Sequence, residues 1–103
     1  MGSLELKRLV NQLTKEVLWL YILSILSKTN THAYVLRKKI LEKFGFLPGN
    51  VTAYVVLYKL ESRGFVSSKK EQNKKVYSIT IKGKKLFKEA KEVFKKKQEM
   101  IFS

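Results

Sequence analysis

Apolar residues recur every three or four positions along most of this chain, and that spacing predicts a mainly helical protein. We expect a first helix from about Leu4 to Leu26, either continuous or bent at Thr14. Its apolar stripe consists of Leu6, Val10, Leu13, Val17 and Leu20. Residues 17–26 are apolar except for Ser24, and a helix that is hydrophobic all round is buried on every side. We therefore expect its own domain to cover one side of this run and a partner subunit to cover the other.

A second helix is predicted from about His32 to Phe44. Thr31 is a suitable N-cap for it, and Gly45 suits its end. The predicted apolar face consists of Tyr34, Leu36, Ile40, Leu41 and Phe44. Three consecutive bases fan around this helix, so at least one of them faces solvent. They are Arg37, Lys38 and Lys39.

A third helix is predicted from about Asn50 to Arg63, with Asn50 as N-cap and Gly64 as the residue that ends it. Its predicted buried face consists of Val51, Leu57 and Leu60. The opposite face is mostly small or uncharged and can form hydrogen bonds, although lysine is abundant elsewhere in the chain. That face consists of Asn50, Thr52, Tyr54, Val55, Tyr58 and Lys59. It suits the base edges in a DNA major groove, but an ordinary half-buried helix is the alternative.

After Gly64 the apolar period changes from that of a helix to that of a strand. We expect two strands, Phe65–Glu71 and Lys75–Ile81, joined by a turn at residues 72–74. Tyr77, Ile79 and Ile81 alternate with more polar residues in the second strand. Four lysines crowd the tip of this hairpin, where they could contact phosphate or simply keep a solvated end soluble. They are Lys69, Lys70, Lys74 and Lys75.

A last helix is predicted to begin at Thr80 or Ile81 and to run to about Ile101. Its large apolar residues form two columns of seven-residue spacing, which is typical of a helix that packs against a partner helix. The columns are Leu86, Val93 and Met100, and Phe87, Phe94 and Ile101. With Val17 and Leu20 of the first helix, these residues are the predicted homodimer interface. The alternative is that the last helix packs back on its own domain.

This order of elements predicts an α+β, mostly α fold: a winged helix-turn-helix with an N-terminal helix and a long C-terminal helix. Within one compact domain, we expect residues 1–80 to form the DNA-binding region and residues 81–103 to form the dimerisation helix. The predicted DNA contacts combine the second and third helices with the hairpin. They are Arg37, Lys38, Asn50, Thr52, Tyr54, Val55, Tyr58, Lys59, Lys69, Lys70, Lys74 and Lys75.

The ionisable residues argue against an enzyme. All eight acidic residues are Glu, His32 is the only histidine, and cysteine is absent. Acid–base catalysis and metal sites need carboxylates, imidazoles or thiolates brought together, and this chain has few of them. We therefore expect no catalytic residue, no metal and no cofactor. The absence of cysteine also fits a cytoplasmic protein.

The net charge of +14 is concentrated after the first helix, because residues 27–103 hold nineteen of the 22 bases and six of the eight acids. A charge of this size predicts a polyanionic partner, with nucleic acid first and an anionic membrane surface second. A lysine-rich surface that only keeps the protein soluble is the alternative.

Several short motifs resemble those of the PadR-like transcriptional regulators, over roughly Leu13 to Ala90. The matching segments are residues 32–36 (HAYVL), 52–54 (TAY), 57–61 (LYKLE), 64–66 (GFV) and 77–83 (YSITIKG). Val55 departs from the family pattern, which commonly has proline there. The resemblance implies a homodimeric, sequence-specific binder of double-stranded DNA, usually a repressor and in some members released by a small planar ligand. The last helix here is short for a ligand-binding member.

Two other functions compete with this interpretation. An architectural DNA- or RNA-binding protein would use the charge without reading sequence, and a membrane-surface protein would use the basic last helix. The weakly charged face of the third helix favours sequence reading over both, since purely electrostatic binding has no use for such a face. The apolar columns of the last helix also suit a helix partner better than a membrane.

Overall fold

The first apolar stripe forms two helices rather than one. In the computed structural model, which describes residues 2–103, helix α1 (Leu4–Asn11) continues into the π-helical turn η1 (Gln12–Glu16), and helix α2 (Leu18–Leu26) follows. The chain bends by 53° between Leu4–Glu16 and Leu18–Leu26. The break lies at Val17 rather than at Thr14, because Val17 leaves the helical conformation (φ −112°, ψ 25°). Thr14 contributes to the wide turn, since its hydroxyl donates to the Val10 carbonyl at 2.6 Å.

Helix α3 (Ala33–Phe44) begins without the expected cap. Thr31 does not cap it, because the Thr31 backbone pairs with Tyr77 instead. The Thr31 amide donates to the Tyr77 carbonyl at 3.2 Å, and the Tyr77 amide donates to the Thr31 carbonyl at 2.8 Å. His32 therefore occupies the N-cap position, and its side chain forms no capping hydrogen bond. Two residues of the predicted apolar face, Tyr34 and Leu41, are exposed.

Helix α4 (Asn50–Ser62) has the predicted extent, but its buried face differs. Ala53, Leu57 and Leu60 are buried, whereas Val51 is 75% exposed. The predicted burial of Val51 is wrong, because six residues separate it from Leu57 and six residues are about one and two-thirds turns of a helix. Gly49, rather than Asn50, is the N-cap.

Strands β1 (Val66–Glu71) and β2 (Lys74–Ile79) form an antiparallel hairpin, the wing. Its turn contains Gln72 and Asn73, both with positive φ, as expected for a tight two-residue hairpin loop. Lys74 is thus the first residue of β2 and not part of the turn. Ile81 does not extend β2, because the Thr80 hydroxyl accepts a hydrogen bond from the Gly83 amide and starts helix α5 (Ile81–Phe102) there.

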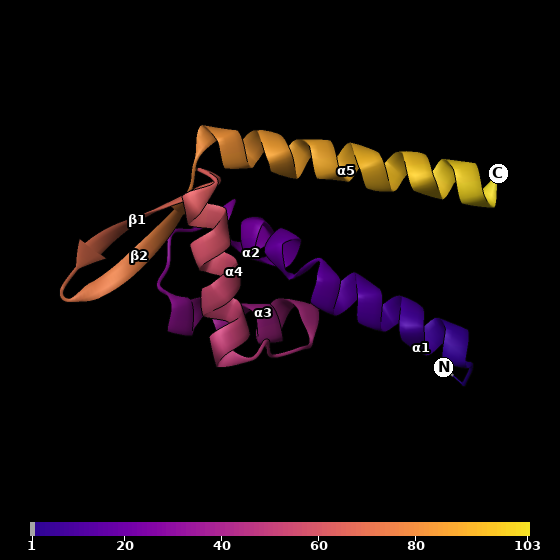
Figure 1. Cartoon of the computed structure of the whole chain (residues 1–103), viewed down its shortest axis with the longest axis horizontal. Helices are drawn as coiled ribbons and strands as arrows, with labels where there is room; N and C mark the ends of the chain where they lie inside the picture. The colour runs from indigo at the N-terminus through magenta and orange to yellow at the C-terminus, as the bar shows by residue number, and fades with distance from the viewer. Residues whose placement is uncertain (1) are drawn as a thin grey trace.

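Helix α2 lies at the centre of the core and packs against α3, α4 and α5. Ile22, Leu23, Leu36, Ile40 and Leu57 are fully buried there. The wing projects from one end of the molecule, while α1 and α5 extend toward the other end as two separate arms (Figure 1), in a shape that measures 49 × 28 × 21 Å.

No single helix within residues 2–103 is long and apolar enough to span a membrane. The bent pair Leu4–Glu16 and Leu18–Leu26 reaches the required length and composition only when its two helices are taken together.

Candidate nucleic-acid interface

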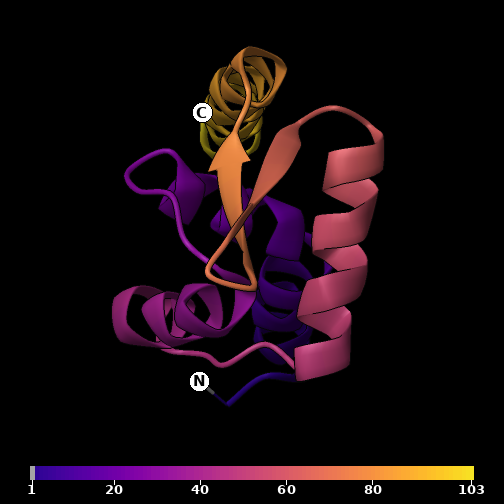
Figure 2. The same ribbon diagram turned by 90° about the vertical axis from the view of Figure 1, so that its left-hand side faces the viewer.

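Helices α3 and α4 and the wing border one face of the molecule (Figure 2). On this face the exposed residues of α4 include no acidic side chain, and the partly buried Glu61 on the wing flank is engaged by Ser68 and Lys75. Val51 and Tyr58 are 75% and 72% exposed, and Tyr54 and Val55 are 49% and 45% exposed. Asn50 and Thr52 are exposed at the start of the helix. The surface therefore offers methyl groups, phenols, one amide and one hydroxyl, which are groups that can contact base edges.

The predicted α4 contacts divide between two flanks of the helix. Tyr54 borders a cleft toward the wing. Thr52 borders a pocket with Thr14 and Lys15 on the other flank, and Lys59 borders a pocket with Trp19. Between the flanks lie Val51, Val55 and Tyr58. Sequence reasoning missed Val51 as part of this surface, although counting helical turns back from Leu57 could have found it.

The two predicted contacts on α3 differ in their environment. Arg37 is half-buried, and its Nε donates to the Pro48 carbonyl at 2.9 Å. This bond holds the connection that leads into α4, so Arg37 positions the start of that helix. Lys38 is exposed, and its Nζ lies 4.9 Å from the centre of the Tyr34 ring.

The four wing lysines also differ in their partners. Lys70 and Lys75 lie opposite each other in the hairpin, while Lys69 lies opposite Val76 and Lys74 lies opposite Glu71. Side chains of successive strand residues point to opposite faces, so the Lys70–Lys75 pair and Lys69 are on different faces.

Glu61 of α4 contacts both strands of the wing and so connects the wing to α4. Its carboxylate accepts a hydrogen bond from the Ser68 hydroxyl and lies 3.7 Å from Lys75 Nζ. The contacts fix the inner face of the wing beside α4, because Ser68 and Lys75 come from β1 and β2. An exposed ion pair of this kind contributes little stability, so its effect is to orient Lys75.

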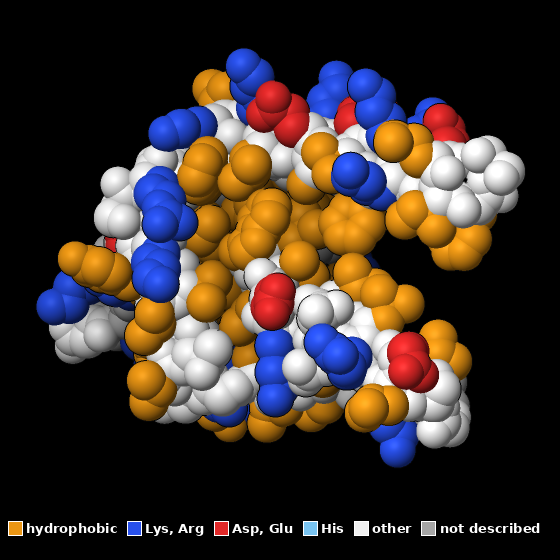
Figure 3. All heavy atoms as spheres, turned by 45° about the vertical axis from the view of Figure 1, so that its right-hand side comes forward, with side chains coloured by type: hydrophobic (Ala, Val, Ile, Leu, Met, Phe, Trp, Pro, Cys, Tyr) orange, Lys and Arg blue, Asp and Glu red, His pale blue; other side chains and the backbone are white. Residues whose placement is uncertain are grey.

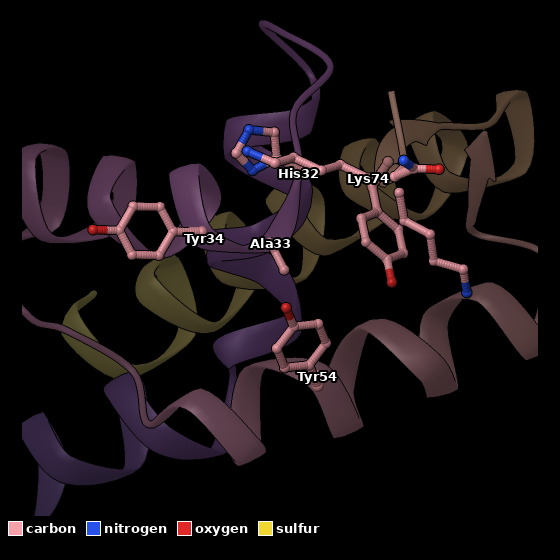
Figure 4. A pocket seen from close by; sticks show the side chains of 8 residues that line it. His32, Ala33, Tyr34, Tyr54 and Lys74 are labelled. Carbon is pink, nitrogen blue, oxygen red and sulfur yellow. The ribbon is translucent and has the colours of Figure 1, made fainter. Parts of the chain in front are cut away.

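A cleft of about 410 Å³ separates the start of α3 from Tyr54 and the wing (Figure 4). It is lined by His32, Ala33, Tyr34, Tyr54, Asn73, Lys74, Lys75 and Tyr77. Burial, followed by the charges of Glu61 and Tyr54, raises the pKa of Tyr77, so its hydroxyl keeps its proton and can donate a hydrogen bond. No sequence pattern predicted this cleft, because its residues come from three separate elements and the start of α3 meets the wing only through the pairing of Thr31 with Tyr77. Within residues 2–103, no three His, Cys, Asp or Glu side chains come together that could hold a metal ion.

The opposite end of the molecule carries an apolar hollow between α5 and the segment formed by η1 and α2 (Figure 3). Leu13, Val17, Leu20, Phe87 and Phe94 help to line a pocket of about 290 Å³ there. The two predicted apolar columns of α5 differ in burial along the helix. The first residue of each column, Leu86 and Phe87, packs on the core, and the later residues are exposed. These exposed residues are Val93, Phe94, Met100 and Ile101.

Solved structures of DNA-binding proteins and regulators have the same fold. A PadR family transcription regulator from Clostridium difficile is 26% identical, with a TM-score of 0.70 and coverage of 82% of this chain and 97% of that one. F93 from STIV, a winged-helix DNA-binding protein, is 26% identical, with a TM-score of 0.71 and coverage of 77% and 88%. Bacillus subtilis PadR in complex with operator DNA is 26% identical, with a TM-score of 0.66, and the match covers 71% of this chain and 45% of that one.

No curated protein matches the chain in sequence. The transcriptional regulator PadR-like family, by contrast, matches residues 22–89, which is more than half of the chain and includes α3, α4 and the wing. The chain therefore belongs to the PadR-like family of transcriptional regulators, which are DNA-binding proteins and not enzymes.

Proposed function

We propose that this regulator is a homodimer that reads a specific sequence in double-stranded DNA and represses transcription. The observation that carries the proposal is the α4 face, which exposes Val51, Val55 and Tyr58 without an acidic group in a strongly basic protein. Methyl groups of valine can contact thymine methyls, and phenol and hydroxyl groups can bond to base edges or phosphates. Repression as the sign of regulation is supported only by the family to which the chain belongs.

The wing lysines supply affinity in this proposal, and α4 supplies specificity. Phosphate contacts set the register of a protein on the duplex, while contacts to base edges carry the sequence information. Lys69, Lys70 and Lys74 are exposed at the wing, so they can reach phosphates on either side of the hairpin. Lys38 extends the basic surface along α3.

The homodimer forms through α1 and α5 in this proposal. Residues 1–80 then serve as the DNA-binding region and residues 81–103 as the dimerisation helix. Support comes from the exposed apolar residues along both helices, which water solvates poorly and which a second copy would cover. A symmetric dimer places its two α4 helices on two half-sites, so the operator should be an inverted repeat.

Selection of bound duplexes from a random pool is the experiment that tests this function. The purified protein should enrich one inverted-repeat motif, with half-sites about one or two helical turns apart. Enrichment without any common sequence would favour the architectural alternative, and failure to retain duplex DNA at all would refute the proposal.

Replacing Thr52 with Ala should cost about 1–3 kcal/mol of binding free energy on the selected operator and little on random duplex. We expect this loss because the exposed Thr52 hydroxyl and methyl lie near the start of α4, where recognition helices usually meet base edges. Tyr58→Phe is the comparison variant, since loss of a phosphate contact should weaken binding to both duplexes evenly. Equal losses on both duplexes for Thr52→Ala would show that Thr52 does not read sequence.

Replacing Lys74 and Lys75 together with Ala should weaken binding to all duplexes by similar factors. Each lost phosphate contact should lower the slope of log K against log salt concentration by about 0.9. The matched control replaces Lys96 and Lys97 with Ala, because these exposed lysines carry the same charge near the far end of α5. Fluorescence anisotropy across a salt series measures both variants. A change in preference between sequences would instead mean that the wing reads bases.

A further inference from the structure

The cleft between α3, α4 and the wing has more hydrogen-bond donors than the fold uses. Figure 4 shows the Tyr54 hydroxyl pointing toward Ala33 at the start of α3, with His32 and Lys74 close to each other above it. The cleft opens on the same face as the exposed residues of α4. A group seated in it would therefore lie beside the recognition surface and in contact with the wing.

The start of α3 supplies the first donors. The first hydrogen bond within this helix runs from the Leu36 amide to the His32 carbonyl at 2.9 Å, so the amides of residues 33–35 have no partner within the helix. No side chain caps them, because His32 forms no capping bond. The positive end of the dipole of this twelve-residue helix thus borders the cleft through Ala33 and Tyr34.

Tyr77 is a second and independent indication of a ligand. Its side chain is only 4% exposed and lines the cleft. The Tyr21 hydroxyl donates to the Leu13 carbonyl at 2.7 Å, whereas none of the side-chain hydrogen bonds within residues 2–103 involves the Tyr77 hydroxyl. No fully buried polar side-chain atom of the described residues lacks a partner, so the Tyr77 hydroxyl must reach the open cleft. A buried tyrosine usually hydrogen-bonds its hydroxyl, and here the acceptor has to lie in the cleft, where a bound group can take the place of water.

The charge around the cleft favours an anion. Lys74 and Lys75 both line it, and Glu61 is the carboxylate that acts on Tyr77. Glu61 is already engaged by Lys75 and by the Ser68 hydroxyl. Lys74 and the α3 dipole therefore remain available to a negative group, and an anion at a helix N-terminus is a stable arrangement.

We infer that this cleft seats one phosphodiester group of the DNA backbone, held by the Tyr54 and Tyr77 hydroxyls, Lys74 and the free amides of α3. This inference rests on the proposed binding of double-stranded DNA. The seat differs from the other wing contacts because Tyr77 and the start of α3 belong to the core, and Tyr54 lies on a helix that packs on it. One rigidly held phosphate in each half-site would set the position of α4 along the groove, which flexible surface lysines cannot do.

The test replaces single phosphates of the selected operator with uncharged methylphosphonates, one linkage at a time. For the unaltered protein, one linkage in each half-site should lower affinity by about tenfold, as expected when a charge-assisted hydrogen bond is lost. Tyr77→Phe should bind the unmodified operator about tenfold more weakly and should lose the sensitivity at that linkage alone. Tyr58→Phe is the comparison variant. It removes a phenol hydroxyl that contacts a different phosphate in our proposal, so it should weaken binding overall but keep full sensitivity at this linkage.

Tyr54→Phe provides the same test at a more exposed position, in case Tyr77→Phe does not fold. If both variants are as sensitive at every linkage as the unaltered protein, the inference is refuted while DNA binding stands. If the unaltered protein binds no duplex, the proposed function fails, and inorganic phosphate becomes the probe. NMR shifts of the Ala33 and Tyr34 amides that phosphate induces, and that Tyr77→Phe abolishes, would then support an anion seat for free phosphate. Unchanged amide shifts would refute the seat as well.

Discussion

Replacing Phe94 with Glu is expected to convert the proposed dimer to a monomer and to lower operator affinity by about 10²–10⁴-fold. Phe94 is 45% exposed and lines the apolar hollow with Leu13 and Phe87, where a second copy would cover it. A carboxylate buried there without a partner would oppose association strongly. The protomer should still fold, since Phe94 lies outside the buried core. A monomer can contact only one half-site, so it loses the higher affinity that a dimer obtains by binding two half-sites at once.

Lys95→Gln is the matched control, because it lowers the net charge by the same amount at the next, exposed position of α5. Sedimentation should give twice the protomer mass for the unaltered protein and for this control, and the protomer mass for Phe94→Glu. Affinity should be measured for the inverted repeat and for a single half-site. A loss on the inverted repeat alone would mean lost avidity, and a loss on both duplexes would mean lost DNA contacts. If Phe94→Glu remained a dimer, the apolar hollow beside α5 would not be the interface.

The sequence predicted the elements that are set by local chemistry. Gly45 and Gly64 both have φ of 81°, so each ends its helix where a left-handed residue is required. Thr80 starts α5 by accepting a hydrogen bond from the amide of Gly83. The alternation around Tyr77 likewise predicted the hairpin, because the period of a strand depends only on neighbouring residues.

The errors arose where a distant partner decides the outcome. Thr31 is a good N-cap by residue type, but pairing with Tyr77 satisfies its backbone and leaves the start of α3 uncapped. The all-apolar run of α2 predicted burial correctly for Ile22 and Leu23. The position of the bend at Val17 depended on the π-helical turn, for which no sequence rule exists.

Only part of the candidate site could be predicted from the sequence. The lysines of the wing and Tyr54 could be proposed because a lysine cluster and an uncharged helix face are visible in one segment each. The cleft could not, because it joins residues from the start of α3, from α4 and from the wing. From the sequence, His32 could be placed only at the approximate start of the second helix. Its place with Lys74 in the lining of the cleft follows from the tertiary fold.

Gly83 links α5 to the rest of the fold, and its replacement by Ala should destabilise the protein severely. A Cβ at this position would lie 2.0 Å from the Phe65 carbonyl oxygen and 2.8 Å from Ile79 Cγ1. The oxygen belongs to backbone that also accepts a hydrogen bond from the Thr80 amide at 3.1 Å, so it cannot move without breaking that bond. Overpacking against backbone typically costs about 1–3 kcal/mol, and loss of the bond adds to that cost.

The expected destabilisation by Gly83→Ala is opposite to what helix propensity alone predicts, so the measurement distinguishes the two arguments. Ala is more favourable than Gly inside a helix by about 1 kcal/mol, so a sequence-only argument predicts that Gly83→Ala stabilises α5. Gly49→Ala is the control, because a Cβ there meets only the Thr52 side chain, at 3.4 Å, and should change stability by about 1 kcal/mol or less. Urea unfolding followed by circular dichroism, at one protein concentration, compares the variants. Gly83→Ala should lower the free energy of unfolding by several times the effect of Gly49→Ala. Equal or greater stability would mean that α5 does not pack against the Phe65 backbone, and the attachment of the proposed dimerisation helix to the wing would then have to be different.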